Sequence, residues 1–292
     1  AIIAGFLASV FGGRRVLISG TSASFMVIVF GVVNSHGLEG MFIVTVMAGL
    51  FLVLFGLLRL GNVIKIIPYP IVTGFTSGIA VIIFTSQIKD FFGMTTGALP
   101  PEFLGKWTAY FKGIPTVDGP TLAVGVVALA IMLIWPRINA KIPGAFIALI
   151  ITSVVVKLWL KDVPTIGSAF SDLPSSFAPI HFPVITVDKI QALAAPALAI
   201  AFLASMETLL SAVVSDGMIG DRHHSNTELI AQGIANIGAG LFGGLPATGA
   251  MARSAANIKN GGRTPLAGIF HAVVLLIVLL FLMPLAKLIP LT

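Results

Sequence analysis

The sequence predicts an all-α polytopic membrane protein, and three observations support this fold class. The chain has 292 residues, of which 57% are hydrophobic and only 10% charged. Its mean hydropathy of +1.05 is too high for a water-soluble domain of this length. Hydrophobic stretches follow one another along the whole chain, separated by short segments with charge, glycine or proline. We therefore expect residues 1–292 to form one transmembrane domain of about ten membrane segments.

The expected membrane segments are the hydrophobic runs, taken in order. They are 1–12, 21–35, 41–60, 70–88, 119–136, 143–160, 192–215, 227–242, 246–257 and 266–289. Residues 100–114, with Trp107, Tyr110 and Phe111 beside lysines, are interpreted as an amphipathic turn at the membrane interface or as a packed loop. The chain starts and ends within hydrophobic runs and has no signal peptide, so we expect a fragment of a larger protein.

The basic residues predict which loops face the cytoplasm. Placing the Arg14-Arg15 loop inside also places inside Arg59, Lys65, Arg137, Lys141, Arg222, Lys259 and Arg263. The short loops 34–40 and 243–246 on the other side contain no Lys or Arg, and the longer loops 89–118 and 161–191 are also expected outside. The net charge of +6 thus reflects membrane topology, and no basic-aromatic run indicates a nucleic-acid partner.

Two segments share a pattern that predicts an inverted repeat. Each has Phe-Gly-Gly, then an extended stretch, then a short helix that begins with small and hydroxyl residues, at 11–24 and 242–254. By the orientation above, the chain enters the first from the cytoplasm and the second from outside. Two half-helices that meet near the membrane midplane would have this pattern. The alternative is two glycine-rich hairpins at helix ends.

Two half-helices that face each other would attract an anion, because unpaired N–H groups and the positive ends of two helix dipoles converge between them. Small residues let a ligand approach the backbone, and hydroxyl groups add donors. The small and hydroxyl residues of the two segments are Gly20, Thr21, Ser22, Ala23, Thr248, Gly249 and Ala250.

Glu207 and Arg253 are charged residues within expected membrane segments, where charge is usually functional. Desolvation disfavours the charged form of a carboxyl group, so Glu207 is the candidate proton-coupling residue. Ser211, one turn further, shares its helix face. The alternative is a structural Glu207–Arg253 pair. Arg253 is expected either to reach back toward an anion or to extend to the cytoplasmic interface with Lys259.

The remaining polar residues support few other functions. Glu228 opens the 227–242 segment, where compensation of the helix dipole is the expected role. His223 and His224 lie in a loop, where we expect solvation and keep a metal site as the weaker alternative. Without cysteine, catalytic triad, phosphate loop or nucleotide fingerprint, the sequence does not support an enzyme or a bound cofactor.

Several motifs together resemble one known family. They are the Phe-Gly-Gly at 11–13 with Ser19-Gly20-Thr21, and the stretches 74–79, 87–91, 226–236 and 253–257. Their order and spacing resemble the sulfate permease (SulP) family, which is solute carrier family 26 in animals. Residues 206–218, together with 87–91, are most similar to the bacterial branch that takes up dicarboxylic acids.

The resemblance implies an inverted seven-plus-seven-helix fold with a core and a gate domain, a cytoplasmic STAS domain that is absent from this chain, and a homodimer. The chain would run from the end of helix 2 through helix 11, with 70–160 in the gate and 1–69 and 161–292 in the core. The implied site comprises Thr21, Ser22, Ala23, Glu207, Ser211, Gly249, Ala250 and Met251, with positive potential from Arg253.

The resemblance also implies a secondary active anion transporter of the bacterial inner membrane, which takes up a dicarboxylate or sulfate with protons by an elevator-type movement. Many members have proline where Thr21 stands. Sodium-coupled bicarbonate members carry Asp at the position of Glu207 and a hydroxyl residue at that of Met251, so the sequence favours protons over sodium.

The alternatives are sodium-coupled or exchange transport of bicarbonate or chloride, and an anion channel or membrane sensor of the same fold. The nucleobase-transporter family also shares this fold. It would need polar side chains that read a base, which Ala247, Ala250 and Met251 do not provide.

Overall fold

The computed structural model describes residues 1–64, 69–97, 99–100, 102–139, 142–170 and 186–292. The expected cytoplasmic residues Lys65 and Lys141, and residues 171–185 of the expected 161–191 loop, lie outside the described residues. Contacts divide the chain into two compact units. Unit 1 comprises Ala1–Thr73 and Ser176–Ile277, and unit 2 comprises Gly74–Ser175 and Val278–Thr292.

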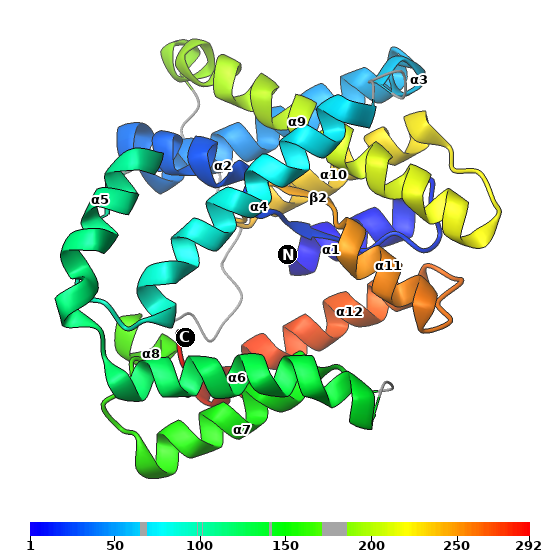
Figure 1. Ribbon diagram of the computed structural model, residues 1–292. Coiled ribbons are helices and arrows are strands. Elements are labelled where there is room, and N and C mark those ends of the chain that lie inside the picture. The colour runs from blue at the N-terminus through cyan, green and yellow to red at the C-terminus, as the bar shows by residue number, and fades with distance from the viewer. Residues whose placement is uncertain (65–68, 98, 101, 140–141, 171–185) are drawn as a thin grey trace. The chain divides into compact units, whose positions relative to one another are not determined.

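Figure 1 labels the main elements of both units. Unit 1 contains α1 (Ile2–Phe11), β1 (Ser19–Thr21), the 3-10 helix η1 (Ala23–Phe25), α2 (Met26–Leu57), α3 (Gly61–Ile64), α9 (Val187–Ile219), α10 (Ser225–Leu241), β2 (Ala247–Gly249), α11 (Met251–Lys259) and α12 (Leu266–Ile277). Unit 2 contains α4 (Tyr69–Phe91), whose first residues belong to unit 1, α5 (Phe103–Gly113), η2 (Ile114–Thr116), α6 (Gly119–Ile138), α7 (Gly144–Trp159), α8 (Ile166–Ala169), the π-helical η3 (Val278–Leu282) and α13 (Met283–Ala286).

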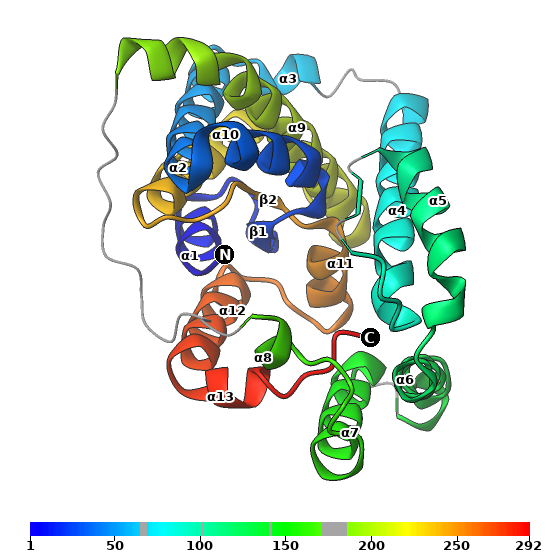
Figure 2. The same cartoon turned by 90° about the vertical axis from the view of Figure 1, so that its left-hand side faces the viewer.

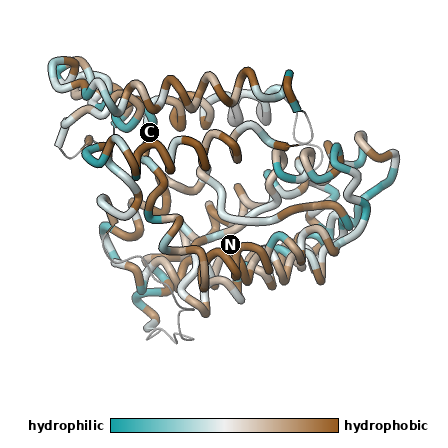
Figure 3. Tube along the Cα trace, turned by 90° about the horizontal axis from the view of Figure 1, so that it is seen from below, coloured by the Kyte–Doolittle hydropathy of each residue, from teal (hydrophilic) through white to brown (hydrophobic). Residues whose placement is uncertain are grey.

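Four helical stretches in the described part of the chain are long and hydrophobic enough to cross a membrane. They are Ala23–Leu57, Gly119–Ile138, Val187–Ile219 and Leu266–Ala286, and the shorter helices α1 and α7 are also hydrophobic. Figure 3 shows the hydrophobic residues along these helices. The expected membrane segments are mostly helical, apart from short strand residues at the starts of 21–35 and 246–257. The all-α membrane fold is confirmed.

The expected segments 21–35 and 41–60 form one long element, α2, with a break at Gly37. Gly37 has φ 66° and ψ −169° within this helix. Glycine adopts positive φ without the steric cost that a side chain would impose. The break lies in the expected 34–40 loop, so the two segments remain separate helical stretches on either side of it.

The core of unit 1 forms where α2, α9 and α10 pack together. Its large buried side chains include Phe25, Leu52, Leu193, Ile200 and Leu229. Glycines allow α2 and α10 to approach closely, because a Cβ atom on Gly49 would lie 2.6 Å from the Gly233 carbonyl oxygen, and the reverse is also true. This packing holds α10 beside the two strands.

β1 and β2 form an antiparallel pair within unit 1, beside α1, α9 and α10 (Figure 2). The register pairs Ser19 with Gly249, Gly20 with Thr248 and Thr21 with Ala247. Each strand leads into a helix, β1 into η1, which continues into α2, and β2 into the short helix α11. The extended stretches predicted from the two Phe-Gly-Gly patterns therefore lie side by side.

In unit 2, residues 103–113 form helix α5, so the expectation of a turn or loop over 100–114 is wrong. The Tyr110 hydroxyl donates to the Thr85 carbonyl of α4 at 2.9 Å. The Trp107 ring contacts both Tyr110 and Phe111. These aromatic residues lie three and four positions apart, the spacing of one helix face, and their packing stabilises the helix.

The division into units differs from the expected core and gate ranges at 161–175 and 278–292, which group with the middle of the chain. The Gly167 N–H donates to the Lys287 carbonyl at 2.9 Å, and Thr165 forms a β-bridge with Pro290. These backbone contacts join α8 to the end of the chain within unit 2.

Candidate functional site

The strand pair brings the starts of the two half-helices together, as the inverted repeat predicts. Ser22 follows β1 and caps η1, because its hydroxyl accepts a hydrogen bond from the Ser24 N–H. Ala250 follows β2 and is the N-cap of α11. The two helices start at opposite ends of a pair three residues long, which separates them by about 7 Å along the strands.

The start of α11 presents backbone donors. No described side chain caps this helix. The Ala250 N–H donates to the Ile18 carbonyl at 2.8 Å, which holds the first turn against the residue before β1. The next N–H groups, on Met251 and Ala252, have no partner within the helix and lie at the positive end of its dipole. They are candidate donors to an anion.

Side chains of α9 hold β2 from one side. The Thr208 hydroxyl accepts from the Gly249 N–H at 3.0 Å and lies 2.9 Å from the Thr248 hydroxyl. The buried Ser211 hydroxyl donates to the Gly249 carbonyl at 2.8 Å. The structure thus gives Ser211 a role in holding the strand, and its expected contact with substrate stays a prediction.

Glu207 precedes Thr208 on α9 and faces the start of η1. The hydroxyls of Ser22 and Ser24 lie close to its carboxyl group and 2.8 Å from each other. In the described part of the chain no ion pair joins Glu207 to Arg253. The alternative of a structural Glu207–Arg253 pair is therefore wrong, and Glu207 lies directly beside a predicted binding residue.

The Arg253 side chain lies against β1. A Cβ atom on Gly20 would overlap the Arg253 Nη1 atom. The side chain thus reaches back to the strand pair, rather than toward Lys259 at the far end of α11. Arg253 is exposed, and no described acidic residue forms an ion pair with it. Its positive charge is therefore available near both helix starts.

A cavity of about 440 Å³ lies beside the start of η1. Its lining combines two polar residues with apolar ones: Thr21, Ser22, Ala23, Phe25, Met26, Val29, Phe30, Val33, Leu245 and Pro246. Three expected binding residues, Thr21, Ser22 and Ala23, thus share one cavity. The expected residues Gly249, Ala250 and Met251 are not part of its wall and lie at the other end of the strand pair.

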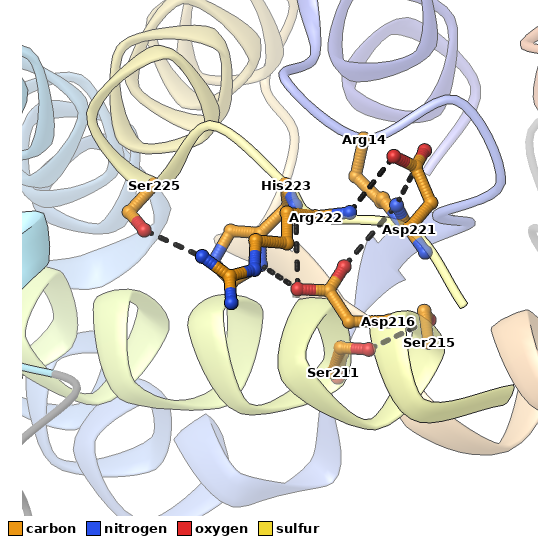
Figure 4. A network of polar contacts seen from close by, with 8 residues as sticks. All are labelled: Arg14, Ser211, Ser215, Asp216, Asp221, Arg222, His223 and Ser225. Carbon is orange, nitrogen blue, oxygen red and sulfur yellow. Dashed lines mark hydrogen bonds and ion pairs between the residues drawn. The ribbon is translucent and has the colours of Figure 1, made fainter. Parts of the chain in front are cut away.

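The sequence pattern does not predict the buried ionic network around Arg14 (Figure 4). The Arg14 side chain is 2% exposed, and its Nη1 atom lies 3.1 Å from carboxylate oxygens of both Asp216 and Asp221. His223 Nδ1 lies 2.7 Å from Asp216, and its Nε2 lies 3.0 Å from the Ser225 hydroxyl. His223 is buried, so the expectation of solvation is wrong for this residue, whereas His224 is exposed. No group of metal-binding residues occurs in the described ranges.

Glu228 is also buried, with 1% of its surface exposed. Its carboxyl group lies beside the backbone N–H groups of Gly13 and Arg14, and its Oε2 atom has no hydrogen-bond partner in the described part of the chain. Glu228 therefore connects the segment before β1 to α10, in addition to any effect on the helix dipole. Sequence reasoning missed this role, although Glu228, Gln232 and Asn236 recur every four residues, the spacing of one helix face.

Comparison with known proteins identifies the family. The model of the sulfate permease family matches residues 1–292. The chain belongs to this family. Its family and relatives are transporters rather than enzymes. The resemblance drawn from the sequence motifs is confirmed, and the protein is an integral membrane protein of the sulfate permease family.

Two bacterial relatives match almost the whole chain. The putative sulfate transporter YvdB of Bacillus subtilis is 43% identical over 291 residues, which cover 99% of this chain and 55% of YvdB. The bicarbonate transporter BicA of Synechocystis is 34% identical over 303 residues, which cover 100% of this chain and 52% of BicA. The chain thus spans about half the length of these relatives.

Solved structures show the same fold. The transmembrane domain of a cyanobacterial bicarbonate transporter BicA matches with a TM-score of 0.87 and 33% identity, covering 100% of this chain and 76% of that one. The structure of SLC26A9 matches with a TM-score of 0.83 at 17% identity, covering 99% of this chain and 50% of that one. The chain therefore has the inverted-repeat fold of these transmembrane domains.

Proposed function

We propose that the full-length protein is a secondary active anion transporter that takes up sulfate or a small dicarboxylate together with protons. The observation that carries this proposal is the antiparallel pairing of β1 with β2, which sets two helix starts close together. Such starts bind an anion through backbone N–H groups and dipoles. Membership of the sulfate permease family and similarity to YvdB support an anion such as sulfate.

In this proposal Arg253 and Glu207 have opposite effects on the anion. Arg253, beside Gly20, contributes positive potential. Glu207, beside Ser22 and Ser24, would repel the anion when ionised. Protonation of Glu207 removes this repulsion, so that proton binding and anion binding favour each other. That reciprocity is the thermodynamic requirement for symport.

The proposed movement is of the elevator type. The expected core, 1–69 and 161–292, would carry the site across the membrane against the expected gate, 70–160. The presence of two compact units supports two moving bodies, with boundaries that place 161–175 and 278–292 in the same unit as the gate residues. We further propose a homodimer in the bacterial inner membrane.

Uptake by the full-length protein in proteoliposomes tests substrate and coupling. Radiolabelled sulfate, succinate, fumarate and bicarbonate are supplied with and without an inward proton gradient. We expect saturable uptake of sulfate or a dicarboxylate that exceeds equilibrium only when the gradient is imposed. Uncoupled current without saturation would instead identify a channel.

Replacing Glu207 with glutamine tests the coupling residue. Glutamine retains hydrogen-bonding groups for Ser22 and Ser24 but cannot bind a proton. We expect Glu207→Gln to lose proton-driven accumulation while still binding the anion. The matched control is Glu39→Gln, since Glu39 pairs with Lys189 at 3.1 Å and is 41% exposed. A Glu207→Gln protein that still concentrates substrate under a proton gradient would refute the coupling role.

Similarity to BicA favours a second candidate, sodium-coupled or exchange transport of bicarbonate. A sodium site needs oxygen ligands, and the Met251 side chain at the start of α11 offers none. This residue therefore supports protons as the coupling ion. In the same liposomes, an inward sodium gradient that drives bicarbonate accumulation would establish the second candidate instead.

A further inference from the structure

Three polar side chains on one face of α10 contact both strands or the segment leading to them. Glu228, Gln232 and Asn236 are each at most 1% exposed, and their spacing of four residues places them on one helix face. The Glu228 carboxyl group lies beside the backbone of residues 13 and 14, before β1. Buried polar groups are costly unless they are paired, and both Gln232 and Asn236 have hydrogen-bond partners for their amide atoms.

Gln232 joins the two strands through its two amide atoms. Its Oε1 atom accepts from the Ser19 hydroxyl of β1 at 3.1 Å. Its Nε2 atom donates to the Ala247 carbonyl of β2 at 2.9 Å. Ser19 and Ala247 are at opposite ends of the pair, because Ser19 pairs with Gly249 and Ala247 pairs with Thr21. The Gln232 side chain therefore connects diagonally opposite corners of the strand pair.

Asn236 holds β2 through both of its amide atoms. Its Oδ1 atom accepts from the Ala247 N–H at 2.8 Å, and its Nδ2 atom donates to the Ala247 carbonyl at 3.0 Å. Nδ2 also lies 2.8 Å from the Gln232 carbonyl. Both backbone polar groups of Ala247, the first residue of β2, are thus hydrogen-bonded to Asn236.

We propose that Gln232 and Asn236 are positioning residues for the anion site, which act through the strand pair and touch no substrate. This inference rests on the proposed function. Side chains in a strand alternate between faces, so a slip of one residue between β1 and β2 would reverse which groups face the site. By fixing Ala247 and Ser19 against the rigid helix α10, the two amides set the register and hence the separation of the two helix starts.

The strands themselves cannot set this register. Each has only three residues, and short pairs without side-chain support are marginal. On the other side of β2, Thr208 and Ser211 bind Gly249, at the end opposite Ala247. The α10 amides are therefore needed to fix the end of β2 that pairs with Thr21.

The test uses the full-length protein with Gln232→Met and Asn236→Leu, which keep approximate size and remove the polar atoms. Thr227→Ala, an exposed residue of α10, is the control. We measure KM and maximal rate of sulfate uptake per folded protein, and amide hydrogen exchange of residues 19–21 and 247–249. We expect KM to rise about tenfold or more with little change in maximal rate, because a misplaced helix start loses hydrogen bonds to the anion.

Hydrogen exchange separates positioning from local support. The hydrogen bonds of Asn236 in the described residues go to Ala247 of β2 and to the Gln232 backbone, and none goes to β1. Faster exchange at 19–21 in Asn236→Leu would therefore show that the loss is transmitted through the pair. Faster exchange at 247–249 alone, with an unchanged KM, would overturn the proposal. If Asn236→Leu does not fold, a double-mutant cycle that combines Gln232→Met with Ser19→Ala gives the same test. Additive effects of the two substitutions on KM would overturn the proposal.

Failure of the proposed function has a different signature. If the parent protein shows no saturable uptake of any anion tested, the transport proposal fails, while hydrogen exchange at 19–21 still decides whether the two amides hold the strand pair.

Discussion

At the scale of single residues, the candidate site depends on which side chain lies beside which backbone. Arg253 occupies the space that a side chain at position 20 would fill. Glu207 lies beside two serine hydroxyls instead of this arginine. The two charged side chains are thus not paired with each other, which is compatible with the separate roles proposed for them.

Gly20→Ala is expected to displace the Arg253 guanidinium group, because the new Cβ atom would overlap its Nη1 atom. The displaced atoms are the end of a flexible side chain, so the protein should fold. We expect KM for sulfate uptake to rise about tenfold, the effect of losing one charge-assisted contact. Uptake kinetics and a thermal melt of the purified protein measure these effects. An unchanged KM would show that Arg253 does not act on the anion from this position.

At the scale of elements, close helix packing and helix capping determine how the units hold together. α2 and α10 meet at glycines, where backbone faces backbone with no side chain between them. In α6, the Asp118 carboxylate accepts from the Thr121 N–H at 2.9 Å and caps the helix. Neither feature involves a predicted binding residue, so the loss of either should reduce stability more than selectivity.

Gly49→Ala should destabilise unit 1, because its Cβ atom would lie 2.6 Å from the Gly233 carbonyl oxygen and 2.7 Å from the Ile237 nitrogen. Backbone atoms cannot move aside easily, and overpacking costs about 1–3 kcal/mol. Gly31→Ala, in the same helix, is the control, since no atom lies within 4 Å of its Cβ position. Thermal unfolding in detergent measures the melting temperatures of both variants. Equal melting temperatures for the two variants would contradict the close contact seen in the structure.

Asp118 predicts a pH-dependent contribution to stability. Hydrogen bonds from Thr121 hold the pKa of the Asp118 carboxyl below its ordinary value of 3.8. A carboxyl whose pKa is lowered by folding stabilises the folded state above its ordinary pKa, and this contribution is lost as the pH falls through the lowered pKa. Asp118→Ala should therefore lower the melting temperature at pH 7.

The difference in melting temperature between the parent and Asp118→Ala should shrink once the pH falls below about 4. Asp118→Asn, which retains a cap without a charge, should lie between Asp118→Ala and the parent protein at neutral pH. A difference that stays constant down to the lowest accessible pH would show that the carboxylate charge does not contribute to the cap.

At the scale of the whole molecule, the basic loops predict one orientation in the membrane, which labelling can test directly. The chain contains no cysteine, so each introduced thiol is the only one in this domain. Arg15, Arg222, His36 and Leu245 are all exposed. We expect Arg15→Cys and Arg222→Cys to react with an impermeant reagent only from the cytoplasmic side, and His36→Cys and Leu245→Cys only from outside.

The accessibility of the four thiols decides the inverted arrangement of the half-helices. The chain reaches the first half-helix from the loop that contains Arg15 and the second from the loop that contains Leu245. Labelling of both loops from the same side of the membrane would contradict an inverted repeat, whatever the substrate.

Much of the fold follows from local pattern. Hydrophobic runs identify the membrane segments, and Phe-Gly-Gly followed by small residues identifies the half-helices. Residues 103–113 were the exception, because a short helix held by Tyr110 and Trp107 has no long hydrophobic run. The sequence pattern also does not predict the roles of Arg14 and His223. Their polar side chains resemble ordinary loop residues until their partners are known.

The sequence by itself determined the membrane class, the family, the two half-helices and the two charged residues to consider, because each depends on spacing and hydropathy within a short stretch. Only the tertiary structure decided that β1 pairs with β2, that Glu207 lies beside Ser22 and Ser24, and that α10 holds Ala247. Arg14 and Asp221 form their bond across 207 positions of the chain. Such contacts join segments far apart in sequence, and local pattern contains no information about which of them meet.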